Sequence, residues 1–169
     1  LGIDDESIVN GLLKFQGVGR RFQMLGERRF ERGTALVVDD YGHHPREIKS
    51  TLDAFRAVWP DKRLVHVFQP HRYTRTQSLF ADFVDVLSMS DQLLLLDIYP
   101  AGEEPIPGVS SEQLANEIRQ HGIHVSVVTE SNVEQQLNQL VVDGDVVLMQ
   151  GAGNIGQLAT NLMQMRESA

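Results

Sequence analysis

Cysteine is absent from the 169 residues, which excludes disulfide scaffolds, thiolate metal sites and cysteine nucleophiles. Long apolar runs are missing as well, and aliphatic stretches such as residues 93–96 fall far short of the ~20 residues that a membrane-spanning helix needs. The chain does not open with a basic segment followed by an apolar one, so we expect no signal peptide. These features fit a cytoplasmic protein, which is the location we expect.

An excess of positive charge is also missing. Fifteen Lys and Arg residues against 23 Asp and Glu residues give a net charge of −8. This balance disfavours a general nucleic-acid or anionic-membrane surface, so any anionic ligand must meet a local group of basic side chains. Basic residues gather in two places, residues 20–32 and residues 71–75. With 41% hydrophobic residues, the chain can bury a core, and we expect a single domain over residues 1–169.

Apolar segments of strand type alternate with segments of helical periodicity. The expected strands are 21–27, 34–39, 64–68, 93–98, 125–128 and 146–149, and the expected helices are 4–15, 45–59, 72–89, 111–121, 132–142 and 156–165. Such alternation predicts parallel strands joined by right-handed crossovers, with the first strand added as a hairpin partner. The predicted fold class is therefore α/β, a doubly wound, Rossmann-like, mostly parallel six-stranded sheet with helices on both faces.

The polar residues that follow the strands are the candidates for function, because ligands bind at the carboxyl ends of strands in open α/β sheets. Four such segments stand out, residues 39–45 (DDYGHHP), 69–76 (QPHRYTRT), 97–103 (DIYPAGE) and 150–156 (QGAGNIG). We expect the four strand ends to share one edge of the sheet and their side chains to converge there.

The first segment carries acidic and imidazole groups with more than one possible use. The carboxylates at 39–40 suit a ribose hydroxyl or the water shell of a magnesium ion, or else a helix cap or turn. His43 and His44 suit the orientation or polarisation of a substrate group, or else lie solvated in a loop. A metal site would need further ligands such as His66 and His71, whose spacing matches no known pattern.

Two other segments carry basic groups and glycines. Arg72 and Arg75 stand at i and i+3 of an expected helix start and form a clamp for a carboxylate or phosphate, unless they are surface arginines paired with acids such as Asp82. Residues 151–156 fit G-x-G-x-x-G, but no acid-bearing strand follows, so we expect a tight turn and close packing rather than NAD binding. The sequence contains neither a Walker A loop nor a G-x-S-x-G elbow.

Taken together, the four segments resemble the C-terminal domain of the Mur ligase family. The resemblance implies an ATP-dependent amide ligase of peptidoglycan precursor synthesis that joins L-alanine to UDP-N-acetylmuramate through an acyl phosphate. It also implies two further domains outside this chain, one for the nucleotide sugar and a central one with the P-loop and most of the Mg²⁺ ligands. The chain, which begins at Leu1, would then be a fragment that is inactive alone. A ligase that recycles murein tripeptide, or a non-catalytic module that binds a nucleotide or amino acid, remains the alternative.

The resemblance assigns roles to individual residues and assigns no metal ligand to this chain. The implied partners are ATP, UDP-N-acetylmuramate, L-alanine and the other domains of the same enzyme, with no nucleic acid and no membrane. The implied ATP-binding residues are Arg21, Asp40 and Tyr41, the implied amino-acid-binding residues are Tyr41, His43, Arg72 and Arg75, and the implied catalytic residues are His43, Arg72 and Arg75.

Overall fold

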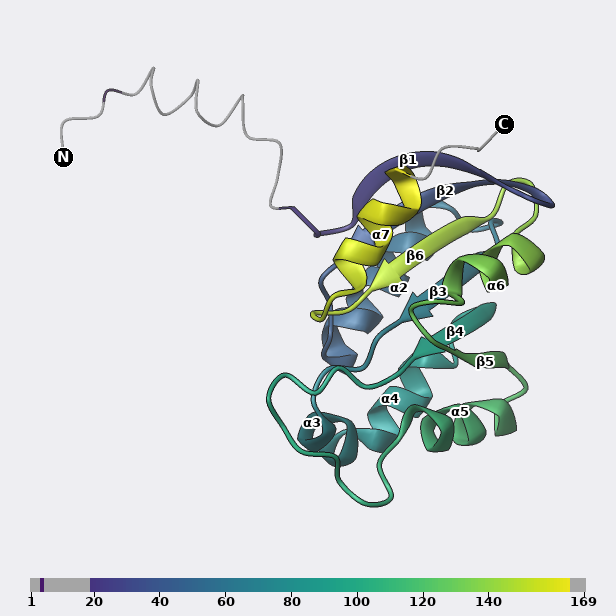
Figure 1. Cartoon of the computed structure of the whole chain (residues 1–169). Helices are drawn as coiled ribbons and strands as arrows, with labels where there is room; N and C mark the ends of the chain where they lie inside the picture. The colour runs from purple at the N-terminus through teal and green to yellow at the C-terminus, as the bar shows by residue number, and fades with distance from the viewer. Residues whose placement is uncertain (1–3, 5–18, 165–169) are drawn as a thin grey trace.

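The computed structural model describes residue 4 and residues 19–164, which form a six-stranded sheet in the order β1-β2-β6-β3-β4-β5 between two layers of helices (Figure 1). The strands are β1 (Gln23–Phe30), β2 (Gly33–Asp40), β3 (Leu64–Phe68), β4 (Gln92–Leu96), β5 (His124–Val128) and β6 (Val146–Gln150). The helices are α2 (Pro45–Val58), α3 (Tyr73–Ser78), α4 (Phe80–Leu87), α5 (Ser111–Gln120), α6 (Val133–Leu140) and α7 (Ile155–Gln164). The β1–β2 pair is antiparallel and the other pairs are parallel, which confirms the predicted fold class. The helix expected over 4–15 lies outside the described residues apart from residue 4.

The central strands are apolar throughout because helices cover both faces of the sheet. Every residue of β3 and β6 is buried, as parallel strands with two covered faces require. Helices α2, α4 and α5 pack on one face, where Phe55, Phe83 and Leu114 are fully buried. Helices α6 and α7 pack on the other face through residues such as Leu137 and Ala159.

The first strand differs from its expected bounds of 21–27. Arg20 and Phe22 adopt positive φ angles of 58° and 48°, so extended backbone begins only at Gln23. A two-residue turn at 31–32 then lets pairing run on to Phe30, which lies opposite Gly33. A bulge between Met24 and Gly26 interrupts the register.

The helix expected over 72–89 is two helices, and this prediction was wrong in its continuity. The break falls at Leu79, whose φ and ψ of −116° and 25° leave the helical region. Leu79 N still donates to Arg75 O at 3.0 Å and Phe83 N to Leu79 O at 2.9 Å, so a single non-helical residue separates the two helices.

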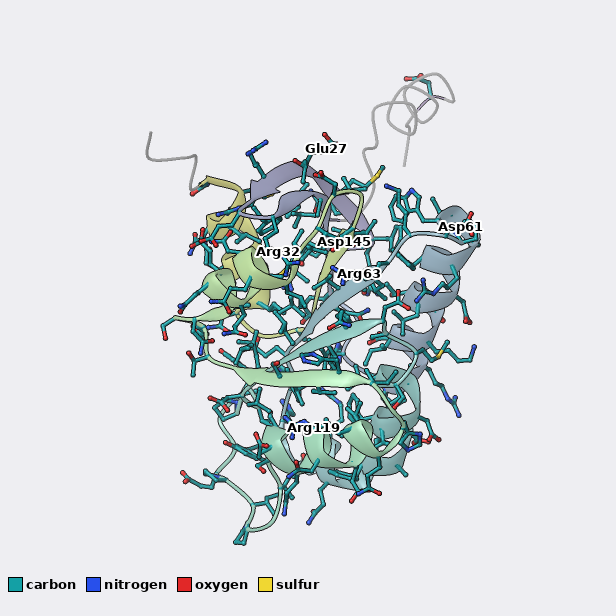
Figure 2. All side chains as sticks on the ribbon, turned by 90° about the vertical axis from the view of Figure 1, so that its right-hand side faces the viewer. Glu27, Arg32, Asp61, Arg63, Arg119 and Asp145 are labelled. Atoms are coloured by element: carbon teal, nitrogen blue, oxygen red, sulfur yellow. The ribbon has the colours of Figure 1, made fainter. Side chains whose placement is uncertain are left out.

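The four polar segments do share one edge of the sheet, as predicted. Asp40 and Phe68 both lie in register with Gln150, and Phe68 lies opposite Leu95 of the next strand. The residues after β2, β3, β4 and β6 therefore leave the sheet at the same end. At the opposite end, Arg63 and Asp145 form a two-point ion pair, with Nη2 and Oδ2 2.6 Å apart (Figure 2).

Candidate functional site

Four aromatic rings form a continuous row along the carboxyl edge. The Tyr41 and His43 rings meet edge to face with centroids 5.5 Å apart, and the His43 and His71 centroids are 5.8 Å apart. His71 then stacks on Tyr99 at 5.4 Å. The row links the ends of β2, β3 and β4, so it brings predicted site residues from distant parts of the sequence into one surface.

Arg75 holds His71 in its neutral form. Arg75 Nη1 donates to His71 O at 3.0 Å and lies 3.3 Å from His71 Nδ1. Because a guanidinium can only donate, Nδ1 must be the unprotonated nitrogen in this contact. Burial lowers the pKa of His71, and the charges of Arg75, His43 and Arg72 lower it further. A neutral imidazole at this place can accept a proton or donate one hydrogen bond.

Arg72 is the cap that precedes α3 and does not lie in the helix, which corrects the expected start of the helix at residue 72. Arg72 has a φ of 75°, and its N donates a hydrogen bond to Tyr99 O at 2.8 Å. The Arg72 side chain is 49% exposed, and its Nη1 lies 3.7 Å from Glu103 Oε1 rather than near Asp82. Hydrogen bonds from Thr74 Oγ1 and N lower the pKa of Glu103, so a carboxylate balances the charge of Arg72.

The start of α2 is capped by the side chains of His44 and Glu47. His44 Nδ1 accepts from Arg46 N at 3.3 Å, while Glu47 Oε2 accepts from the backbone of His43 and His44. Burial alone would raise the pKa of Glu47, but these two hydrogen bonds, with His43 and Arg21 nearby, lower it. His44 is thus a helix cap, and His43 is the histidine of the pair that joins the ring row.

Asp40 is almost fully buried and its carboxylate is occupied by internal hydrogen bonds. Oδ1 accepts from Gly42 N at 2.9 Å, Thr51 Oγ1 at 3.1 Å and Gln150 Nε2 at 2.7 Å, and Oδ2 accepts from Phe22 N at 2.9 Å. This hub joins the turn before β1, the turn after β2, helix α2 and strand β6. The ATP contact assigned to Asp40 stays a prediction, and the geometry gives Asp40 a scaffolding role.

The two adjacent arginines before β1 point to different surroundings. Arg20 Nε donates to Asp39 Oδ2 at 3.0 Å, and its guanidinium lies 5.1 Å from the centre of the Tyr41 ring. Burial raises the pKa of Asp39 although Arg20 opposes the shift. Arg21 is exposed and lies close enough to Glu47 to influence its pKa, so Arg21 remains available to a ligand.

The glycine segment after β6 serves close packing, as expected. A Cβ at Gly153 would lie 2.4 Å from Gln69 Oε1 and 2.8 Å from Tyr99 Cγ. Gln69 binds both Asn154, through Nε2, and the first amide of α7, at Ile155 N. The segment is therefore fastened to the ends of β3 and β4.

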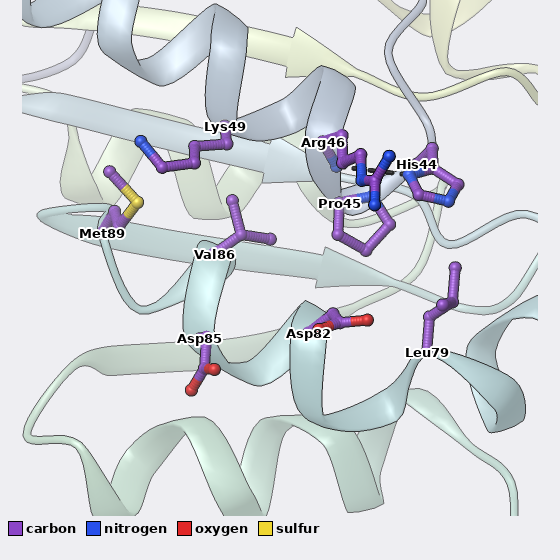
Figure 3. A pocket seen from close by; sticks show the side chains of 9 residues that line it. All are labelled: His44, Pro45, Arg46, Lys49, Leu79, Asp82, Asp85, Val86 and Met89. Atoms are coloured by element: carbon purple, nitrogen blue, oxygen red, sulfur yellow. Dashed lines mark hydrogen bonds between the residues drawn. The ribbon is translucent and has the colours of Figure 1, made fainter.

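A separate groove of about 600 Å³ lies between α2 and α4 (Figure 3). Arg46 and Lys49 of α2 line one side of it, and Asp82 and Asp85 of α4 line the other. His44 and Leu79 also line it. The groove holds none of the residues predicted for ATP or the amino acid.

The patterns in the sequence gave no role to several residues that build this edge. Tyr99 completes the ring row, Gln69 accepts a hydrogen bond from Ile155 N, and Gln150 donates one to Asp40 Oδ1. Glutamines placed directly at strand ends were the available signal, because an amide can donate and accept at once.

Within residues 19–164 no three His, Asp or Glu side chains converge to hold a metal ion. None of the helices in that same range is long and apolar enough to cross a membrane.

The fold and the site define a class of protein, a doubly wound α/β domain that presents imidazole, phenol and guanidinium groups at its ligand edge. A family model described as the Mur ligase, glutamate ligase domain matches residues 20–153. The chain belongs to the Mur ligase family.

Individual relatives agree with this membership. UDP-N-acetylmuramate–L-alanine ligase of Legionella pneumophila (strain Corby) is 69% identical over 164 residues, which cover 97% of this chain and 35% of the relative. The solved UDP-N-acetylmuramate–alanine ligase of Thermotoga maritima matches with a TM-score of 0.71 and 24% identity, covering 96% of this chain and 33% of that one. A murein peptide ligase from Psychrobacter arcticus matches with a TM-score of 0.63 and 21% identity, covering 99% of this chain and 35% of that one. The two solved structures support the fold alone, and the chain spans 35% of the length of the curated relatives that it matches.

Proposed function

We propose that this chain is the C-terminal domain of a three-domain, ATP-dependent ligase that joins L-alanine to UDP-N-acetylmuramate in the cytoplasm. The observation that carries the proposal is the 69% identity to a ligase of that name over 97% of the chain. The ring row and its neighbouring arginines give the domain an edge suited to anionic and zwitterionic substrates. A nucleotide-sugar domain and a P-loop domain would be supplied by the remainder of the parent protein.

In the proposed reaction a carboxylate oxygen of the muramyl group attacks the γ-phosphorus of ATP, and ADP leaves. The amine of L-alanine then attacks the acyl carbon, loses a proton, and phosphate departs with the electrons of the C–O bond. Positioning and charge neutralisation supply most of the help for such phosphoryl transfer. Closure of this domain over the site would exclude the water that hydrolyses an acyl phosphate.

The side chains of the edge take complementary parts in this proposal. Arg72, whose side chain is 49% exposed, binds the carboxylate of L-alanine, and Arg75 keeps His71 neutral beside it. His43 lies between Tyr41 and His71, where it orients the amine and the reacting oxygens. Arg21, which is exposed and lies near Glu47, contacts ATP.

Mg²⁺, when bound, would neutralise the charge of the ATP phosphates. The donor set of this chain does not fit a metal site, because no three suitable side chains converge within the described residues. We therefore place the Mg²⁺ ligands in the remainder of the parent protein and assign no step to a metal held here.

Phosphate release by the parent protein tests the proposal. With ATP, Mg²⁺ and UDP-N-acetylmuramate present, release is expected to depend on L-alanine when amino acids are offered singly. Release only with a free murein tripeptide would identify the recycling ligase instead. Absence of release with every amine would leave a binding module and refute the ligase.

A further inference from the structure

The side chain of Arg20 joins three segments that are far apart in the sequence. Its Nε donates to Asp39 Oδ2 at 3.0 Å at the end of β2, and its Nη2 donates to Gly151 O at 2.6 Å after β6. Its guanidinium carbon lies 5.1 Å from the centre of the Tyr41 ring. Arg20 thus connects the first ring of the row to the glycine segment before α7.

The backbone around Arg20 is held in an unfavourable conformation. Arg20 has a φ of 58° and Phe22 a φ of 48°. A non-glycine residue in this region costs on the order of 1–3 kcal/mol and persists where its surroundings fix it, most often at functional sites. Two hydrogen bonds hold this backbone conformation: Tyr41 N donates to Arg20 O at 2.7 Å, and Phe22 N donates to Asp40 Oδ2 at 2.9 Å.

Helix α7 leaves room for the guanidinium because residue 156 is glycine. A Cβ at Gly156 would lie 2.4 Å from Arg20 Nε and 2.5 Å from its Cζ. Any larger residue must push the guanidinium aside. The Arg20 side chain is 27% exposed, so it lies largely within this frame.

We propose that Arg20 is a positioning residue that fixes the ring of Tyr41 at the ligand edge and couples it to the segment after β6. The proposal rests on the proposed function, because it acts through the substrate contact assigned to Tyr41. The Nε and Nη2 atoms of Arg20 already donate to Asp39 and Gly151, so Arg20 positions the Tyr41 ring and does not itself bind the substrate.

An arginine is required here because the N–H donors of a guanidinium point in different directions within one rigid plane. The same guanidinium therefore binds the Asp39 carboxylate and the Gly151 carbonyl, while its flat face lies over the Tyr41 ring. A lysine ammonium presents a point charge and cannot hold both partners and the ring in one geometry.

A double-mutant cycle in the parent protein tests the coupling. Arg20→Ala and Tyr41→Ala are each expected to raise the KM of the same substrate, Arg20→Ala by about fivefold. The double variant is expected to be no worse than Tyr41→Ala alone, and Arg20→Lys is expected to resemble Arg20→Ala. Additive losses, or an unchanged KM in Arg20→Ala, would overturn the proposal.

Gly156→Ala tests the positioning role without removing Arg20. It leaves Arg20 in the chain but displaces its guanidinium, so the KM should rise as in Arg20→Ala. The Tm should fall, because the bonds to Asp39 and Gly151 are lost, but by no more than in Arg20→Ala, since alanine favours a helix over glycine. The matched controls are Asn161→Ala, an exposed change in the same helix, and Arg32→Ala, an arginine at the far turn of the same hairpin. Both should leave the KM unchanged, and a normal KM in Gly156→Ala would contradict the proposal.

A ligand-free measurement distinguishes failure of this inference from failure of the proposed function. In the 169-residue chain, Arg20→Ala and Gly156→Ala should both shift the Tyr41 ring-proton resonances, whereas Arg32→Ala should not. If the parent shows no phosphate release at all, the ligase proposal fails while these shifts still decide the coupling. If release is normal and the shifts are absent, the coupling alone fails.

Discussion

His71 and Tyr99 stack with their ring centroids 5.4 Å apart and their planes 15° apart, although one follows β3 and the other follows β4. The backbone enforces this contact. The two residues form a parallel bridge, Tyr99 N donates to Pro70 O at 2.8 Å, and Arg72 N donates to Tyr99 O at 2.8 Å. The ring row is therefore built on backbone hydrogen bonds, and its chemistry can be changed one side chain at a time.

Arg75→Gln is expected to raise the pKa of His71. Burial keeps that pKa low, and the charges of Arg75, His43 and Arg72 lower it further, so loss of one positive charge moves it back toward the ordinary value. An NMR titration of the imidazole protons in the 169-residue chain measures the change. Arg119→Gln on α5 removes a distant arginine and should leave the titration as it was. An unchanged or lower pKa in Arg75→Gln would refute the contact.

The free energy of unfolding is expected to fall as pH drops from about 6.5 to 4, because of His66. Burial lowers the pKa of His66 to about 4, whereas the unfolded chain takes up the proton near 6.5. Unfolding therefore binds a proton in this window, and the loss at its acid end is about 3 kcal/mol.

Urea unfolding at several pH values measures the effect of His66. His66→Asn, which keeps an acceptor for Ser90 Oγ, should flatten the slope between pH 6.5 and 4. His121→Asn, at an exposed position, should keep it. Equal slopes in all three proteins would show that His66 titrates normally.

Asp40→Asn is expected to destabilise the chain by about 2–4 kcal/mol. The amide nitrogen of asparagine would replace a carboxylate oxygen that now accepts hydrogen bonds, and a nitrogen that is itself a donor cannot accept them. Both oxygens of Asp40 receive hydrogen bonds from within the domain. Thermal unfolding measures this loss. If stability were unchanged and only the KM for ATP rose in the parent protein, the ATP contact would be the main role of Asp40.

Gly153→Ala is expected to destabilise the chain by about 1–3 kcal/mol, the usual cost of forcing extra atoms into a packed site. Its Cβ would collide with Gln69 and Tyr99, both of which fix the edge. Gly19→Ala is the matched control, since a Cβ there would meet its nearest neighbour at 3.7 Å. Denaturant midpoints of the two variants give the comparison, and equal midpoints would contradict the packing role of Gly153.

Arg72→Ala in the parent protein is expected to lower kcat/KM for L-alanine by roughly 30- to 100-fold, as loss of a charge-assisted hydrogen bond predicts. Binding of UDP-N-acetylmuramate should change little, because the carboxylate held by Arg72 belongs to the amino acid. Steady-state kinetics and a binding titration measure the two quantities. Arg46→Ala, an exposed arginine on α2, serves as the control, and equal losses in both measurements would refute the clamp.

Patterns in the sequence predicted the strands best where the structure is most regular. The strand at 64–68 was placed at its observed bounds, because five buried apolar or β-forming positions between polar turns admit one arrangement. The helix over 72–89 was wrong because its break is a change of backbone angles at Leu79 alone, which periodicity does not reveal. The convergence of the strand ends followed directly from the parallel topology.

The candidate site was harder to predict in its details. Residues 20 and 21 are both arginine, and only the left-handed backbone at Arg20 turns that side chain inward. In the same way, the stacking of Tyr99 on His71 depends on the path of an irregular segment, which carries no repeating pattern. The backbone conformation at a single residue therefore decides that Arg20, and not the chemically identical Arg21, is held by Asp39.

The position of β6 between β2 and β3 has a consequence for how the domain is made. This strand is the last of the six in sequence, yet it joins the two halves of the sheet. During synthesis on the ribosome, the edges of β2 and β3 that pair with β6 stay unpaired until residues 146–150 have emerged. Long-range pairing of this kind slows folding and leaves strand edges exposed to other chains. A message that stops before the codons for β6 would therefore yield two unjoined half-sheets, which are targets for chaperones and proteases rather than a smaller working domain.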